Sequence, residues 1–233
     1  FLSKRKFKVA SISRNFPEKK LKIKGVQYKK IDITKKILLK KKINTNYDFI
    51  INCSGYIDHS NKKGTIQTHF NGGKNLVQFF ASKKIKRFIQ IGSSLEYGKK
   101  RSPQSETDEK YSSNYYAKSK LKLSNYLRKI YKKKRFPFIV LRLYQVYGPY
   151  QKKNRLIPFV IDSCIKNRKF PCSDGKQIRD FLYIDDLSNL ILKIINRTYI
   201  KSKFYNIGTN KPKSVRNVIK LISKIVKKGE PEF

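Results

Sequence analysis

Short runs of β-branched and aromatic residues alternate along this chain with longer stretches of mixed polar and apolar residues. This alternation is typical of βαβ units that build a parallel sheet. The short runs predict strands at Lys6–Ser13, Val26–Ile31, Asp48–Cys53, Arg87–Ile91, Phe136–Tyr144 and Lys203–Ile207. The longer stretches predict helices at Gly72–Lys84, Asn114–Lys133, Ile157–Asn167, Ile184–Ile195 and Ser214–Val226. Continuously apolar strand interiors such as Phe138–Leu141 indicate a sheet covered by helices on both faces.

The charge of the chain is strongly one-sided, with 56 Lys and Arg against 15 Asp and Glu in 233 residues. Lysines occur in almost every segment and form no single arm or stripe, and the accompanying bias toward Ile, Asn, Tyr and Phe is typical of an AT-rich coding genome. We therefore interpret the charge as solvated faces, with a nucleic-acid or other polyanion surface as the alternative. In either case anionic ligands, including nucleotide diphosphates, approach through an attractive field.

The three cysteines Cys53, Cys164 and Cys172 suggest no disulfide framework and no metal-ligand pair, so we expect reduced thiols in a cytoplasmic protein. The two histidines, His59 and His69, are too isolated to predict a zinc site, and no metal is expected. No apolar run approaches the roughly 20 residues that a membrane span needs. The chain opens in mid-pattern without methionine, so we expect a fragment open at both ends.

Tyr116 and Lys120 stand four positions apart on a predicted helix and share one face. An ammonium in that place can lower the pKa of a phenol toward neutrality and make it a usable proton carrier. The spacing alone favours an ordinary exposed helix face. Ahead of it, however, the strand Arg87–Ile91 runs into Ser93 and Ser94, and ligands of open α/β sheets bind beyond the carboxyl ends of strands.

Four motifs follow one another in a distinctive order: Ser93–Gly98, Tyr116–Lys120, Leu141–Pro149, and Arg179–Phe181 together with Asp185–Leu187. Together they resemble the extended short-chain dehydrogenase/reductases, also called the NAD-dependent epimerase/dehydratase family, over nearly the whole chain. That family contains nucleotide-sugar 4-epimerases, 4,6-dehydratases and 4-ketoreductases. The resemblance implies an α/β, Rossmann-like doubly wound parallel sheet with a small C-terminal substrate lobe, truncated at the N-terminus. Residues 1–148 are expected to form the dinucleotide-binding domain and 149–233 the substrate-binding region.

The resemblance also implies a catalytic group of Ser93, Tyr116 and Lys120. Tyr116 is expected to act as acid and base on the sugar hydroxyl or ketone, and Lys120 to tune it and hold the nicotinamide ribose. Ser93 is expected to orient the reacting oxygen, with Ser94 as the alternative.

Cofactor contacts are implied for Arg14, Asp32, Ile33, Cys53, Ser54, Gly55 and Asn71, besides Tyr116 and Lys120. Asp32 matches the family's acidic residue near the adenine, and Asn71 its helix asparagine on the cofactor side. The turn from Asn52 to Gly55 matches the segment that passes under the cofactor, although an ordinary strand-exit turn is the alternative. Arg14, where the second strand ends, slightly favours NADP over NAD, with chance placement as the rival explanation.

Substrate contacts are implied for Ser94, Tyr97, Gln145 and Arg179. Arg179 matches a ligand of the sugar diphosphate, for which its guanidinium fork suits the geometry, and a salt-bridge role is the alternative. Gln145 stands where the family usually has Asn. The substrate is then a nucleotide-diphosphate sugar, and the full-length protein is expected to be a homodimer.

Two departures from the family pattern qualify the expected function. The family's opening strand and its glycine-rich phosphate turn are absent, so we expect weak dinucleotide binding. We also expect an open groove where that first strand should sit, beside Lys6–Ser13 and Asp48–Cys53. The family's dehydratases carry an acidic pair where this chain has Ser94 and Leu95. This favours a 4-epimerase or 4-ketoreductase, with a 4,6-dehydratase or a non-catalytic RNA-binding scaffold of the same fold as alternatives.

Overall fold

A computed structural model describes residues 1–56, 58, 60–108, 114–200 and 203–233. The chain divides into two compact units, which are described separately. Unit 1 comprises Phe1–Arg142 and Leu192–Asn206, and unit 2 comprises Leu143–Ile191 and Ile207–Phe233. The expected domain division at residue 148 stays a prediction. His59 lies outside the described residues.

The main sheet of unit 1 has the strand order β10-β5-β4-β3. Its strands are β3 (Phe49–Asn52), β4 (Arg87–Ser93), β5 (Phe138–Leu143) and β10 (Phe204–Ile207). β3 and β4 pair in parallel, with Asn52 opposite Gln90. A separate parallel pair joins β1 (Val9–Ser13) to β2 (Val26–Lys30). All six predicted strands are therefore present, although each differs by a few residues at its ends.

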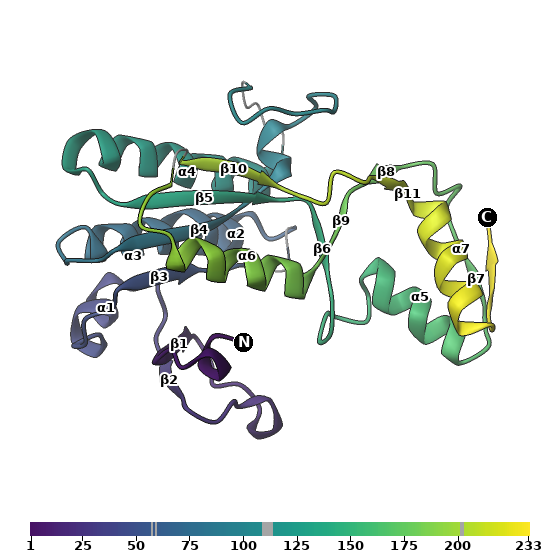
Figure 1. Ribbon diagram of the computed structural model, residues 1–233, viewed down its shortest axis with the longest axis horizontal. Helices are drawn as coiled ribbons and strands as arrows, with labels where there is room; N and C mark the ends of the chain where they lie inside the picture. The colour runs from purple at the N-terminus through teal and green to yellow at the C-terminus, as the bar shows by residue number, and fades with distance from the viewer. Residues whose placement is uncertain (57, 59, 109–113, 201–202) are drawn as a thin grey trace. The chain divides into compact units, whose positions relative to one another are not determined.

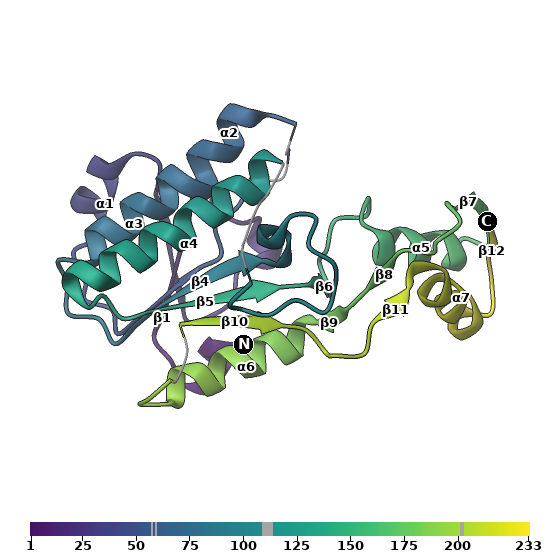
Figure 2. The same cartoon turned by 90° about the horizontal axis from the view of Figure 1, so that it is seen from above.

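Helices α3 (Gly73–Phe80) and α4 (Tyr115–Lys134) of unit 1 lie side by side along the main sheet (Figure 1). The same pair is seen from above in Figure 2. Asn114 caps α4, because its side chain accepts a hydrogen bond from the Ala117 N–H at 2.8 Å. The remaining elements of this unit are α1 (Lys36–Lys42), α2 (Lys62–Ile66), a π-helix at Gln67–Gly72 and 3-10 helices at Leu2–Arg5, Lys19–Leu21 and Ser94–Tyr97.

Hydrophobic packing between α3, α4 and the sheet forms the core of unit 1. Leu76, Val77 and Phe80 from α3 meet Leu123 and Leu127 from α4, and all five side chains are buried. Burial of large aliphatic and aromatic side chains contributes about 1.5–3 kcal/mol each. This packing sets the position of α4, which carries Tyr116 and Lys120.

Unit 2 consists of small strand pairs and two packed helices. The pairs are β6 (Gln145–Tyr147) with β9 (Phe181–Tyr183), β8 (Ile178–Arg179) with β11 (Lys213–Ser214), and β7 (Lys169–Pro171) with β12 (Glu230–Glu232). Helices α5 (Leu156–Ile165) and α7 (Val215–Val226) enclose a small core of Val160, Cys164, Phe170 and Ile219. Helix α6 (Ile184–Asn196) runs from unit 2 into unit 1.

Candidate active site

The buried strand β4 ends in a tight turn that fixes Ser93. The Ser93 hydroxyl oxygen accepts a hydrogen bond from the Leu95 N–H at 3.2 Å, and the Glu96 carboxylate accepts one from the Ser93 N–H at 3.1 Å. This reciprocal arrangement is a capping box, which stabilises the following 3-10 helix. Ser93 itself is 7% exposed, whereas Ser94 is half-buried and Leu95 is exposed. The turn therefore fixes the Ser93 oxygen more firmly than that of its neighbour.

Lys120 reaches from helix α4 to the same end of β4. Its Nζ donates a hydrogen bond to the Ile91 carbonyl at 2.8 Å, two residues before Ser93. The Lys120 side chain is 6% exposed, and its Nζ lies 5.8 Å from the centre of the half-buried Tyr116 ring. Lys120 and Tyr116 therefore share one helix face, beside the strand end that carries Ser93. That the hydroxyls of Ser93 and Tyr116 face one cleft stays a prediction.

Burial lowers the pKa of Lys120 from its ordinary 10.5 to about 8. Desolvation is the largest cause, because removing an ammonium from water disfavours its charged form. The negative charge of Glu96 acts in the opposite direction and raises the pKa. Lys120 consequently carries its charge at neutral pH but loses it at a lower pH than an exposed lysine.

His69 is a neighbour of Tyr116 that the sequence did not assign to the site. Its buried ring meets the Tyr116 ring edge-on, with 4.9 Å between the ring centres. Its Nε2 accepts a hydrogen bond from the Tyr56 N–H at 3.0 Å. His69 lies in the π-helix Gln67–Gly72, and such segments occur frequently at functional sites. The π-helical geometry, which could have marked this residue, is not visible in the sequence.

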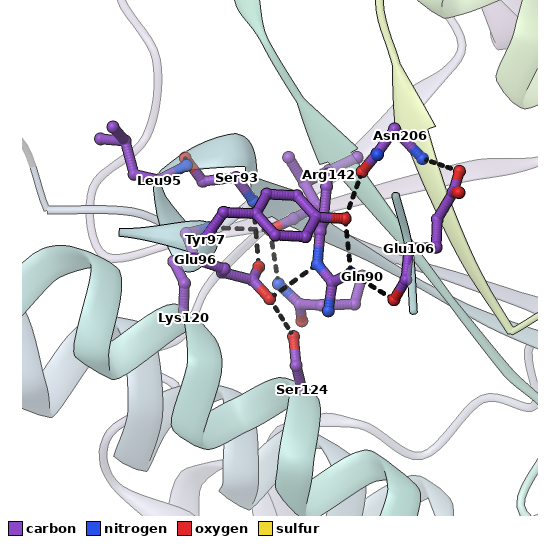
Figure 3. Close-up of polar contacts among 11 residues, drawn as sticks. Gln90, Ser93, Leu95, Glu96, Tyr97, Glu106, Lys120, Ser124, Arg142 and Asn206 are labelled. Carbon is purple, nitrogen blue, oxygen red and sulfur yellow. Dashed lines mark hydrogen bonds and ion pairs between the residues drawn. The ribbon is translucent and has the colours of Figure 1, made fainter. Parts of the chain in front are cut away.

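Behind the turn lies a buried polar network centred on Glu96 and Arg142 (Figure 3). The two side chains are 0% exposed, and Arg142 Nε lies 3.1 Å from Glu96 Oε2. Arg142 Nη1 also donates to the Tyr97 hydroxyl at 2.9 Å, and that hydroxyl donates to Asn206 Oδ1 at 2.7 Å. The predicted substrate contact of Tyr97 stays a prediction that these internal bonds do not favour. The Tyr97 side chain is 1% exposed, and its hydroxyl binds within the protein instead.

A groove of about 700 Å³ lies between β1 and β3, where the sequence predicted an open one. Six of the predicted cofactor residues line this groove: Arg14, Asp32, Ile33, Cys53, Ser54 and Gly55. Asn71, the seventh, is half-buried on the π-helix, where its amide donates to the side chain of Gln67. The prediction of a groove at this place is confirmed.

Side-chain hydrogen bonds shape the turns that line the groove. Asp32 Oδ1 accepts from the Thr34 N–H at 2.9 Å and from the Thr34 hydroxyl at 2.8 Å. Asn52 Oδ1 accepts in the same way from the Ser54 N–H at 3.1 Å and hydroxyl at 2.6 Å, while its Nδ2 donates to Gln90 at 2.7 Å. These bonds account for the conformation of both turns, so the geometry is compatible with the structural and the cofactor-binding interpretations alike.

Two predicted substrate residues, Gln145 and Arg179, lie in unit 2 and are both exposed. The Gln145 N–H donates to the Asp180 carbonyl at 2.9 Å. Arg179 Nη1 donates to the carbonyl of the preceding Ile178 at 2.8 Å, and no carboxylate in the described part of the chain forms an ion pair with it. The guanidinium of Arg179 therefore faces solvent with capacity for an anion.

The remaining features concern cysteines, metal-binding groups and membrane-spanning helices. Cys53, Cys164 and Cys172 are free thiols. Among the described residues, no group of three or more His, Cys, Asp or Glu is placed to hold a metal ion. Within the same ranges, none of the helices combines the length and the apolar character that crossing a bilayer requires.

Comparison with known proteins identifies the family. A family model described as the NAD dependent epimerase/dehydratase family matches residues 1–208. The chain belongs to this family. Among curated relatives of this epimerase/dehydratase chain, the human (Homo sapiens) dTDP-D-glucose 4,6-dehydratase is 29% identical over 151 residues. That match covers 64% of this chain and 43% of the relative, so it spans less than half of the relative's length.

Solved structures confirm the Rossmann-like α/β fold. The UDP-glucose 4-epimerase of Thermotoga maritima, solved with UDP-glucose, superposes with a TM-score of 0.88 at 18% identity. That match covers 100% of this chain and 80% of the epimerase. The dTDP-glucose 4,6-dehydratase of Bacillus anthracis, solved in complex with NAD, superposes with a TM-score of 0.78 at 23% identity, covering 90% and 68%.

Proposed function

We propose that this protein catalyses NAD(P)-dependent chemistry at C4 of a nucleotide-linked sugar, as a 4-epimerase or a 4-ketoreductase. One observation carries the proposal: the buried Lys120 ammonium lies beside the Tyr116 ring and is bonded to the end of the strand that presents Ser93. Burying a cation lowers the stability of a fold, and a positive charge beside a phenol favours the ionised form that proton transfer needs.

In this proposal Tyr116 carries the proton. The neighbouring positive charge of Lys120 favours the ionised form of the phenol, so Tyr116 can accept a proton from a C4 hydroxyl and return one to a C4 ketone. The Ser93 oxygen accepts the Leu95 N–H, which leaves the hydroxyl proton of Ser93 to donate to the reacting sugar oxygen. Ser94 is the alternative donor.

Six of the residues proposed to contact the cofactor line the groove between β1 and β3. Asp32 and Ile33 would hold the adenosine end, and Cys53 to Gly55 would pass under the cofactor. When bound, the nicotinamide would supply the hydride chemistry at C4. Arg14 also lines this groove, where its guanidinium lies 5.8 Å from the centre of the Tyr56 ring. Its charge would suit the 2′-phosphate of NADP, whereas the dehydratase from Bacillus anthracis was solved with NAD.

The position of Glu96 favours an epimerase or ketoreductase over a dehydratase. A 4,6-elimination needs an acid at the sugar, and the carboxylate nearest to the family's position is that of Glu96. Glu96 is 0% exposed and paired with Arg142, so its carboxylate does not reach a ligand. A dehydratase remains the second candidate, because the human relative is named as one.

Substrate and assembly follow from the same proposal. Arg179 would bind the diphosphate of the nucleotide, and Gln145 a sugar or phosphate oxygen. A homodimer located in the cytoplasm is the expected form of the protein.

The test is a turnover assay on the product of the whole gene that encodes this chain. UDP-, CDP-, GDP- and dTDP-linked 4-hydroxy and 4-keto sugars are offered with NAD(H) and NADP(H), and Tyr116→Phe is measured beside the wild type. The variant deletes one oxygen, so we expect nucleotide-sugar binding to persist while kcat falls by roughly 10²–10⁴-fold, the range for a positioned acid/base. Near-normal turnover of Tyr116→Phe would rule out Tyr116 as the proton carrier.

A further inference from the structure

The Glu96 carboxylate is bonded to three different parts of unit 1. Its Oε1 accepts from the Ser93 N–H at 3.1 Å, in the turn at the end of β4. Its Oε2 accepts from Arg142 Nε on β5 at 3.1 Å and from the Ser124 hydroxyl on α4 at 2.9 Å. Figure 3 shows the carboxylate between these partners, beneath the Tyr97 ring. One side chain therefore joins the Ser93 turn to the sheet and to the helix that carries Tyr116.

The bond to Ser124 also concerns the orientation of α4. Ser124 follows Lys120 by four positions and Tyr116 by eight, so the three side chains stand on the same helix face. A hydrogen bond at Ser124 therefore limits the rotation of α4 about its axis. The same carboxylate that holds the Ser93 backbone thus holds the face on which Tyr116 and Lys120 stand.

Space for this carboxylate depends on Gly92. A Cβ atom at Gly92 would lie 2.7 Å from Glu96 Oε1 and 2.9 Å from Val140 Cγ1, both too close for ordinary contact. Glycine at this position lets the Glu96 side chain fold back under β4 instead of pointing outward. The buried position of Glu96 is consequently determined by its neighbour as well as by its own bonds.

We propose that Glu96 is the positioning residue of this active site. It holds the Ser93 turn and the face of α4 that carries Tyr116 and Lys120 in a fixed relative position. The proposal rests on the function proposed above. Glu96 touches neither substrate nor cofactor and acts through Ser93, Ser124 and Lys120.

The charge of Glu96 also acts on Lys120. The groups near the ammonium are the Glu96 carboxylate, the Cys53 thiol, the Tyr116 phenol and the Ile91 carbonyl. Of these, Glu96 has the largest effect in raising the Lys120 pKa against desolvation. Neutralising Glu96 should therefore lower the pKa of Lys120 further, which a residue with a merely structural role would not do.

The experiment compares Glu96→Gln with Glu106→Gln in the product of the whole gene. Glu106 is the matched control, because its carboxylate accepts from the Asn206 N–H at 2.8 Å, whereas the Ser93 N–H and the Ser124 hydroxyl donate to Glu96. Steady-state kinetics with the active sugar give kcat and KM. NMR of 13C-lysine-labelled protein follows the Lys120 titration, assigned by its loss in Lys120→Arg.

For Glu96→Gln we expect kcat to fall by roughly 10- to 100-fold with little change in KM, the cost of misplacing reacting groups. The Lys120 titration should move below its wild-type midpoint, while Glu106→Gln should leave both quantities near wild type. Wild-type kcat and an unmoved Lys120 midpoint in Glu96→Gln would overturn the proposal, as would equal losses in both variants.

A second variant and a second measurement test the proposal if Glu96→Gln does not fold or if no sugar is turned over. If Glu96→Gln does not fold, Ser124→Ala, which deletes one hydrogen bond to Glu96, should lower kcat in the same direction by a smaller factor; unchanged kcat there overturns the proposal. If no sugar is turned over by the wild type, the function proposed above fails. The Lys120 titration in Glu96→Gln then still decides whether Glu96 controls that ammonium.

Discussion

Replacing Lys120 by methionine should stabilise the fold at neutral pH, because the substitution removes a charge that folding buries. The ammonium is 6% exposed and donates to the Ile91 carbonyl at 2.8 Å. Desolvation lowers its pKa from 10.5 to about 8, which means that the folded state disfavours the charged form. Methionine is unbranched and flexible, so it can fill the space of the buried Lys120 side chain without carrying a charge.

The magnitude follows from the two pKa values. A fall from 10.5 to about 8 corresponds to about 3 kcal/mol against folding at pH 7, at roughly 1.4 kcal/mol per pH unit. The substitution also loses the bond to the Ile91 carbonyl, and bonds from charged donors contribute about 1.5–3 kcal/mol. The net gain for Lys120→Met at pH 7 should therefore be about 1 kcal/mol.

The dependence on pH is the sharper test. Between pH 8 and 10.5 the unfolded state binds more protons at Lys120 than the folded state, so wild-type stability rises with pH through this window relative to the variant. The advantage of Lys120→Met should thus shrink by up to about 1.4 kcal/mol per pH unit and reverse near pH 9. Below pH 8 the difference should be constant, because Lys120 is protonated in both states.

Urea unfolding of the wild type and Lys120→Met at pH 7, 8, 9 and 10 measures this difference directly. Lys122→Met is the control, because Lys122 is exposed on the same helix and should show no pH-dependent difference. A difference for Lys120→Met that stays constant from pH 7 to 10 would refute the reasoning, since it would mean that Lys120 is not desolvated.

Three further substitutions test separate parts of the structure. Arg14→Ala should weaken binding of NADP more than of NAD in fluorescence titrations, because only NADP carries the 2′-phosphate; equal losses would contradict its role. Arg179→Ala should raise KM for the sugar nucleotide and leave kcat nearly unchanged, and a fall confined to kcat would argue against diphosphate binding. Gly73→Ala should lower the free energy of unfolding by about 1–2 kcal/mol, because its Cβ would lie 2.4 Å from Leu123 Cδ2. A neutral Gly73→Ala in chemical denaturation would show that Leu123 moves aside.

The sheet and the long helices could be predicted from the sequence because their apolar runs are continuous. Helix α1 (Lys36–Lys42) was missed, since its many lysines hide the short apolar stretch that buries Leu39. The first predicted strand began too early: Lys6 has a left-handed backbone with φ of 63°, and β1 begins only at Val9. Both errors arise where a high lysine content weakens the hydrophobic pattern.

The candidate site was predictable where its motifs are local. Ser93 follows a buried strand, and Tyr116 and Lys120 are one helical turn apart, so local spacing predicts their places while the family resemblance supplies their roles. The pairing of Glu96 with Arg142 joins residues that lie 46 positions apart, and no periodicity indicates it. Tyr97 was assigned to the substrate because it belongs to a strand-end motif, and only its three-dimensional contacts show that it faces inward.

The Lys120 ammonium and the Glu96 carboxylate are best understood together. Desolvation alone would drive the Lys120 pKa further below its value of about 8, toward a neutral amine at physiological pH. A neutral amine would give Tyr116 no positive charge with which to favour its phenolate. At pH 7 a pKa of about 8 keeps roughly ten charged lysines for each neutral one. Glu96 can provide this only because Arg142, Ser124 and the Ser93 N–H satisfy its own buried charge, so the network beneath the turn maintains the charge that the proposed proton transfer needs.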